Sequence, residues 1–234
     1  MKDVHGRNFE GAYGLLQFVI SSLCIEHAYL EKSEKVDPDD KLRFARLKSG
    51  MSSLTDVKTA LVVLTRMMAA HYGKNVILLV DEYDVPLAKA SDKGYYEDML
   101  DVIRSLLGMA WKTNAALKCS VNTGCLRIAK ESIFTGANNF ISNSVSGERY
   151  KKRFGFQETE IRQLLEDADC SEHFEELKVW YDGYHFGDTE IYCPWDVINH
   201  VSLLQINAAA QPANYWQDTS HNNIIRKFCG SPNS

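Results

Sequence analysis

The clearest signal in the hydrophobic pattern is the run Val76-Ile77-Leu78-Leu79-Val80, which Asp81 and Glu82 follow directly. Five consecutive apolar residues are too few to cross a membrane, and the run has no polar face. It therefore predicts a strand that is buried on both faces, as in a parallel sheet. Pro86 is expected to end any extension of this strand, and a loop is expected to reach Gly94.

Amphipathic helices are predicted on both sides of this strand. Apolar residues at helical spacing predict them over residues 9–30, in a short segment that ends at residue 47, over residues 54–72 and over residues 99–110. Ser53 and Asp56 form a capping-box pattern at the start of the third helix. The segment from Leu117 to Asn122 predicts a second buried strand. Because helices and strands alternate, the sequence predicts an α/β fold with a parallel sheet.

The pattern changes beyond Phe154-Gly155-Phe156, where short helical segments carry many aromatic side chains. We therefore place a domain boundary near Tyr150, with an α/β core over residues 1–150 and a small, mostly helical lobe over residues 151–234. The aromatic group from Trp180 to Trp195 could stack a nucleobase. Burial in the core of a small lobe is the favoured interpretation, because aromatic burial supplies most of the cohesion of such a lobe.

Composition and charge narrow the classes of protein. The chain is 45% hydrophobic and 24% charged, which is ordinary for a soluble globular protein. Its formal net charge of −5 gives no general attraction to nucleic acid or anionic lipid. The six cysteines form no C-x-x-C pair, which argues against a zinc site or a disulfide framework and favours a cytoplasmic location. The apolar segment 15–25 resembles a signal peptide, but Glu10 and the lack of a cleavage site favour a core helix.

The acidic pair gives the first candidate chemistry. Asp81 and Glu82 come where the predicted strand leaves the sheet, and ligands of open α/β sheets bind beyond the carboxyl ends of the strands. An apolar strand that ends in Asp-Glu has the form of a Walker B element, in which the Asp holds Mg²⁺ through water and the Glu polarises the attacking water. The alternative is a buried strand followed by a solvated acidic turn.

Six motifs stand in order along the chain. They are Asp81-Glu82-Tyr83-Asp84-Val85-Pro86-Leu87, the segment from Thr123-Gly124 to Thr135-Gly136, Phe154-Gly155-Phe156, Trp180-Tyr181-Asp182-Gly183-Tyr184, Tyr192-Cys193-Pro194-Trp195, and Tyr215-Trp216 with Thr219-Ser220. Together they resemble the AAA-ATPase-like family of bacterial proteins, a branch of the P-loop NTPases. Members of this family often carry a PD-(D/E)xK nuclease-like domain after the ATPase part.

This resemblance implies Mg-ATP as the cofactor and a role for each matching residue. Asp81 is the expected Mg²⁺ ligand, through water, and Glu82 the expected general base. Asn122 and Thr123, at the end of the next strand, take the place of a sensor that orients the attacking water or contacts the nucleotide. Ordinary hydrogen bonding at a strand end is the alternative for both. Arg127 is a candidate for stabilising the charge of the transition state, as an arginine finger does, against the alternative of a surface cation.

The chain departs from the family at Gln157, where the family has a Thr or Ser that caps a helix, and in a second respect that bears on activity. Its 234 residues contain no G-x-x-x-x-G-K-[ST], the Walker A loop whose backbone amides cradle the phosphates. The only Gly-Lys, Gly73-Lys74, precedes the Walker B-like strand, which is the wrong context. We therefore expect a partial P-loop NTPase, the truncated middle of a longer protein without its Walker A strand and nuclease-like domain. ATP binding and hydrolysis, inferred for intact relatives, are expected to be impaired in this chain.

Loss of the Walker A strand has a predicted structural consequence. In sheets of this type that strand lies beside the strand here predicted over residues 117–122, which would then expose an unpaired edge. The expected partners are a complementing segment or a second copy of the chain, with no membrane and no direct nucleic-acid signal. The alternative function is a non-catalytic interaction module, a remnant of such an ATPase.

Overall fold

The computed structural model describes residues 1–112, 114–124, 140–144, 147–186 and 188–215. The chain divides into two compact units, Met1–Phe140 and Ile141–Ser234. The sequence had placed the boundary near Tyr150. Each unit is described by itself below.

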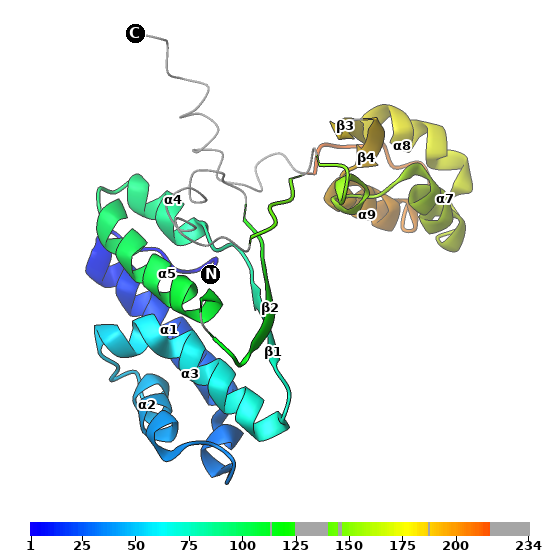
Figure 1. The fold of residues 1–234 in the computed structure, drawn as a ribbon. Helices are drawn as coiled ribbons and strands as arrows, with labels where there is room; N and C mark the ends of the chain where they lie inside the picture. The colour runs from blue at the N-terminus through cyan, green and yellow to red at the C-terminus, as the bar shows by residue number, and fades with distance from the viewer. Residues whose placement is uncertain (113, 125–139, 145–146, 187, 216–234) are drawn as a thin grey trace. The chain divides into compact units, whose positions relative to one another are not determined.

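The first unit is a mixed α/β structure (Figure 1). Its elements are, in chain order, α1 (Phe9–Glu26), η1 (Ala28–Lys32), α2 (Pro38–Lys48), α3 (Leu54–Tyr72), β1 (Val76–Val80), α4 (Val85–Ser91), α5 (Tyr96–Trp111) and β2 (Leu117–Asn122). Both strands predicted from the sequence are therefore confirmed. They pair in parallel, with Val80 opposite Asn122, and form a sheet of two strands among the described residues.

Local sequence explains how α3 leads into β1. The Ser53 hydroxyl accepts the Asp56 N–H at 3.1 Å, and the Asp56 carboxylate accepts the Ser53 N–H at 3.1 Å, which confirms the predicted capping box. The helix ends at Gly73, whose φ of 64° is a left-handed conformation that glycine adopts without steric cost. The chain enters β1 three residues later, at Val76, so the cap helps to set the direction of the strand.

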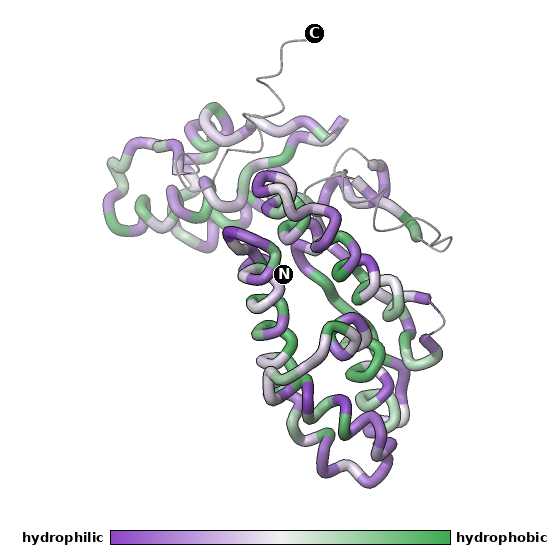
Figure 2. The backbone as a smooth tube through the Cα atoms, turned by 90° about the vertical axis from the view of Figure 1, so that its left-hand side faces the viewer, coloured by the Kyte–Doolittle hydropathy of each residue, from purple (hydrophilic) through white to green (hydrophobic). Residues whose placement is uncertain are grey.

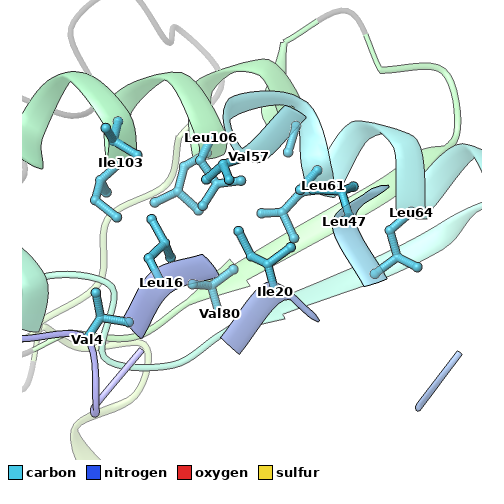
Figure 3. Close-up of a cluster of buried hydrophobic side chains, with 14 of the residues drawn as sticks. Val4, Leu16, Ile20, Leu47, Val57, Leu61, Leu64, Val80, Ile103 and Leu106 are labelled. Carbon is cyan, nitrogen blue, oxygen red and sulfur yellow. The ribbon is translucent and has the colours of Figure 1, made fainter. Parts of the chain in front are cut away.

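The core of this unit lies between the helices and one face of the sheet (Figure 3). The mixed colouring of the helices in Figure 2 reflects their amphipathic pattern, in which the apolar side turns inward. Buried side chains from α1, α2, α3, β1 and α5 meet there, among them Leu16, Ile20, Leu47, Val57, Leu61, Val80, Ile103 and Leu106. The helices thus hold β1 and β2 in place from one side.

The prediction that both strands are buried on both faces is wrong. Ile77 is 53% exposed, Leu79 is 73% exposed and Val121 is 54% exposed, whereas Val80 is 8% exposed. Side chains alternate between the two faces of a strand, so the exposed residues share the face that the helical core does not cover. The apolar residues of a strand make both of its faces suitable for burial. Whether a face is buried depends on which other elements of the protein pack against it.

The segment after β1 also differs from the prediction. Helix α4 occupies residues where a loop to Gly94 was expected, and Pro86 lies in its first turn. Proline lacks an N–H, but the first N–H groups of a helix have no partner within the helix in any case. Pro86 therefore starts a helix here.

The second unit combines helices with a β-hairpin. Its elements are η2 (Lys151–Arg153), α7 (Glu158–Asp167), η3 (Ser171–His173), α8 (Phe174–Tyr181), β3 (Asp182–Phe186), β4 (Thr189–Tyr192) and α9 (Pro194–Leu204). The antiparallel pair β3–β4 was not expected in a mostly helical lobe. The aromatic group divides, because Tyr181 and Tyr192 are buried in the core of this unit while Trp180 and Trp195 are half exposed.

Two further observations concern the described residues as a whole. No helix in them combines the length and the apolar character needed to cross a bilayer. Cys24, Cys119, Cys170 and Cys193 are free thiols, of which Cys24 and Cys170 are buried. Burial raises the pKa of Cys24 to about 12, so this thiol stays protonated and behaves as a packing residue.

Candidate functional site

The carboxyl ends of β1 and β2 lie side by side, and hydrogen bonds hold them together beyond the last residues of the strands. The Thr123 N–H donates to the Val80 carbonyl at 2.9 Å, and the Tyr83 N–H donates to the Thr123 carbonyl at 3.1 Å. The amino group of Met1 donates to the Asp81 carbonyl at 2.9 Å. The ladder therefore brings the acidic pair next to the segment that follows β2, although about forty residues separate them in sequence.

Asp81 and Thr123 form the exposed part of this site. The Thr123 hydroxyl donates to Oδ1 of Asp81, and the Glu82 N–H donates to the same oxygen at 3.0 Å. Both Asp81 and Thr123 are exposed to solvent. Two donors thus orient one carboxylate oxygen, while the side chain as a whole stays accessible to a ligand.

Glu82 has two unusual features. Its φ of 51° places a non-glycine residue in the left-handed region. This conformation costs on the order of 1–3 kcal/mol and is concentrated at functional sites. Its Oε2 atom is buried and has no hydrogen-bond partner among the described residues. A buried carboxylate oxygen without a partner is also uncommon and unfavourable, so folding alone does not account for this side chain.

Asn122 is held away from the acidic pair. It stands opposite Val80 in the register, on the face that the helices cover. Its Oδ1 accepts a hydrogen bond from the Ser120 hydroxyl at 3.0 Å, and that hydroxyl accepts the indole N–H of Trp111 on α5 at 3.2 Å. The structure thus brings the Asp81 and Thr123 side chains together, with Glu82 directly after Asp81, and places the Asn122 side chain on the other face of the sheet from Asp81 and Thr123. Arg127 lies outside the described residues.

The oxygen donors at this edge suit a hard cation. Carboxylate and hydroxyl oxygens are the ligands that Mg²⁺ prefers, and it commonly takes one or two carboxylates with water and phosphate oxygens. Within the described residues, no group of three or more His, Cys, Asp or Glu side chains is placed to hold a metal ion. Asp81 and Thr123 thus supply two oxygen atoms of the kind that Mg²⁺ accepts.

The sequence favoured a structural role for Tyr83 and Asp84, and both side chains lie against Gly124 at this edge. Tyr83 is 8% exposed and Asp84 is 2% exposed. Burial, together with the charge of Asp84, raises the pKa of Tyr83. A Cβ atom at Gly124 would lie 2.7 Å from Oδ1 of Asp84 and 2.8 Å from Cε1 of Tyr83, so only glycine fits. A glycine two residues beyond the end of a strand is the one signal in the sequence for such a close approach.

Comparisons with known proteins agree with the resemblance drawn from the motifs. The model of a family described as "Predicted AAA-ATPase" matches residues 9–134, which include β1, β2 and the acidic pair. A curated protein from Azotobacter chroococcum mcd 1, described as an uncharacterized protein in the vnfD 5′ region, is 29% identical over 157 residues. That alignment covers 67% of this chain and 29% of the relative, so the chain spans less than a third of the relative's length. No solved structure matches the chain.

Proposed function

This chain belongs to the predicted AAA-ATPase family, and from that premise we propose that the carboxyl edge of β1 is the acidic half of an ATP-hydrolysis site. The observation that carries the proposal is Glu82, with its left-handed backbone and its buried Oε2 atom that lacks a partner among the described residues. Both features raise the free energy of the folded state, and both are characteristic of residues at functional sites.

The proposed roles follow from the contacts at this edge. Asp81 would hold Mg²⁺ through water, and the Thr123 hydroxyl orients the Asp81 carboxylate. Mg-ATP, when bound, supplies the γ-phosphate that a water molecule attacks. Glu82 takes a proton from this water on a carboxylate oxygen. Its Oε2 atom has no hydrogen-bond partner in the described part of the chain, so a lone pair is available for that proton.

We further propose that these 234 residues by themselves bind Mg-ATP weakly. Their sequence contains no Walker A loop, and that loop supplies most of the phosphate contacts in this class of site. Equilibrium dialysis with labelled ATP should therefore show no saturation at millimolar Mg-ATP. Tight, saturable binding by the chain alone would contradict this part of the proposal.

The general-base role is tested in a protein that contains the same chain preceded by a strand and a Walker A loop. In that extended protein, Glu82→Gln should lower turnover by about 10²–10⁴-fold, because the amide cannot accept the proton. ATP binding should be preserved, since the change removes no phosphate contact. Glu34→Gln is the matched control, because Glu34 is exposed between η1 and α2. Unchanged turnover in the Glu82→Gln protein would remove Glu82 from the mechanism.

A second candidate function is a non-catalytic interaction module. The observation that favours it is the apolar face formed by Ile77, Leu79 and Val121, each more than half exposed in this structure. The partner we propose is a segment that completes the sheet, or a second copy of the chain. Sedimentation velocity separates these possibilities: a concentration-dependent dimer that Leu79→Asp abolishes indicates a second copy. A monomer at every concentration leaves the completing segment as the proposed partner.

A further inference from the structure

A cavity of about 460 Å³ lies between α2, α3 and α5, away from the ends of the strands. Its lining on α5 includes Arg104, Gly108 and Lys112, and its lining on α3 includes Val62 and Arg66. Residues three or four apart lie on one face of a helix, so α3 and α5 each turn one face toward the cavity, and Lys112 is the residue directly after α5. The volume is in the range of sites that hold small molecules.

The charge of this cavity is one-sided. Arg43, Arg66, Arg104 and Lys112 line it, and none of its described lining residues is acidic. Asp40, which is 9% exposed, accepts a hydrogen bond from Nε of Arg66 at 3.1 Å and so fixes that side chain in place. Arg43 and Lys112 form no ion pair within the described residues. Even with Arg66 paired to Asp40, the lining of the cavity carries only positive formal charges, whereas the whole chain has a formal net charge of −5.

The cavity also has an apolar wall and free space. Val62, Val63 and Met109 contribute apolar side chains to its lining. A Cβ atom built at Gly108 would meet no other atom within 4 Å, which shows that the helix faces open space at this residue. A ligand that fits would therefore combine an anionic group with an apolar portion.

We propose that this cavity binds a small organic phosphate. A phosphate group offers three acceptor oxygens in different directions, which suits cations that come from three helices. A planar carboxylate is satisfied by a single guanidinium group in bidentate geometry. The apolar wall takes the organic portion of the ligand. None of the lining residues belongs to the edge of β1, so this proposal does not depend on the ATPase assignment.

Isothermal titration calorimetry at low salt tests the proposal with three probes: phenyl phosphate, inorganic phosphate and citrate. Phenyl phosphate should bind saturably and more tightly than either of the others, because it alone has both an apolar ring and a phosphate group. Replacing Arg43 and Arg104 together by Gln should weaken its binding at least about tenfold, since each charge-assisted hydrogen bond contributes on this scale. The matched control is the double change Arg7→Gln with Lys74→Gln, two exposed cations outside the cavity.

A second variant tests the location without changing charge. Gly108→Leu has room for its Cβ atom, so the protein should fold, and the rest of the side chain should fill the cavity and abolish binding. Circular dichroism checks the fold. Undiminished binding by a folded Gly108→Leu protein, or equal affinities of the Arg43/Arg104 double variant and the control, would overturn the site. Citrate binding as tightly as phenyl phosphate, or no saturable binding of phenyl phosphate, would overturn the class of ligand.

Discussion

The two faces of the β1–β2 sheet both carry apolar residues of β1, but their environments are opposite. On one face Val80 is buried against the helices, and Asn122 beside it is tied through Ser120 to Trp111. On the other face Ile77, Leu79 and Val121 are exposed, and Asp81 and Thr123 continue the same face at its carboxyl end. The covered face holds the sheet in the unit, whereas the exposed face leads to Asp81 and Thr123 of the candidate site.

On this strand pair, the residues that stabilise the fold and the residues that are accessible to a ligand therefore lie on separate faces. Substitutions on the covered face should change the free energy of unfolding, and substitutions on the exposed face should mainly change what the chain binds. Because side chains alternate, neighbouring residues such as Leu79 and Val80 provide matched tests of this division.

The largest effect is expected from placing a charge on the covered face. Val80→Asp should lower the free energy of unfolding by about 3–5 kcal/mol, because it buries an unpaired carboxylate. Leu79→Asp, one residue earlier, should cost about 1 kcal/mol or less, since it loses only strand propensity on a solvated face. Urea denaturation followed by circular dichroism measures both. Similar losses from the two changes would show that the faces do not differ in this way.

An intermediate effect is expected where the strand ends pack against Asp84. Gly124→Ala should destabilise the protein by about 1–3 kcal/mol, because the added methyl group overlaps a buried carboxylate that has little room to move. Gly14→Ala in α1 is the control, since its Cβ atom meets nothing within 4 Å. That change should be neutral or slightly stabilising, because alanine favours a helix. If Gly124→Ala melts at the temperature of the unchanged protein, the close approach is not rigid.

The smallest effect concerns Asp56, which caps the helix that covers the sheet. The Arg46 guanidinium, at 2.7 Å, and the Ser53 cap hold the pKa of Asp56 well below its usual range. A carboxyl group with a pKa lowered by folding contributes stability that is present above its unfolded pKa, near 4, and is lost as the pH falls through the folded value.

Asp56→Asn should therefore cost about 1 kcal/mol at neutral pH, the scale of a lost helix cap with a partly exposed ion pair. The difference between the two proteins should shrink below about pH 4. Thermal melts across this pH range provide the measurement, and a difference that does not change with pH would rule out the Asp56 charge as its source.

Local patterns in the sequence predicted much of the first unit. The capping box at Ser53 and Asp56, the apolar stripes of the helices and the two apolar strands all depend on neighbours in sequence. Helix α4 was missed because Pro86 was taken as a stop, although the first turn of a helix tolerates it. The hairpin β3–β4 was missed because β3 begins Asp182-Gly183, two residues with low strand propensity.

The candidate site was only partly predictable. Asp81 and Glu82 stand out because a strand precedes them, and Thr123 because it ends the next one. The strained backbone of Glu82 and the position of Asn122 on the covered face depend on how β1 and β2 align, which sequence spacing does not specify. The fit between Gly124 and Asp84 likewise needs two segments that meet only in the folded chain.

The hydrogen bond from Trp111 to Ser120 gives the first unit a natural optical reporter. Trp111 is the only tryptophan among residues 1–140, and the other three are Trp180, Trp195 and Trp216. A protein with phenylalanine at those three positions would emit from one indole whose N–H is linked, through one hydroxyl, to the strand that carries Thr123. Its emission wavelength would then report, in real time, the binding of a ligand beside Thr123 at the carboxyl end of β2.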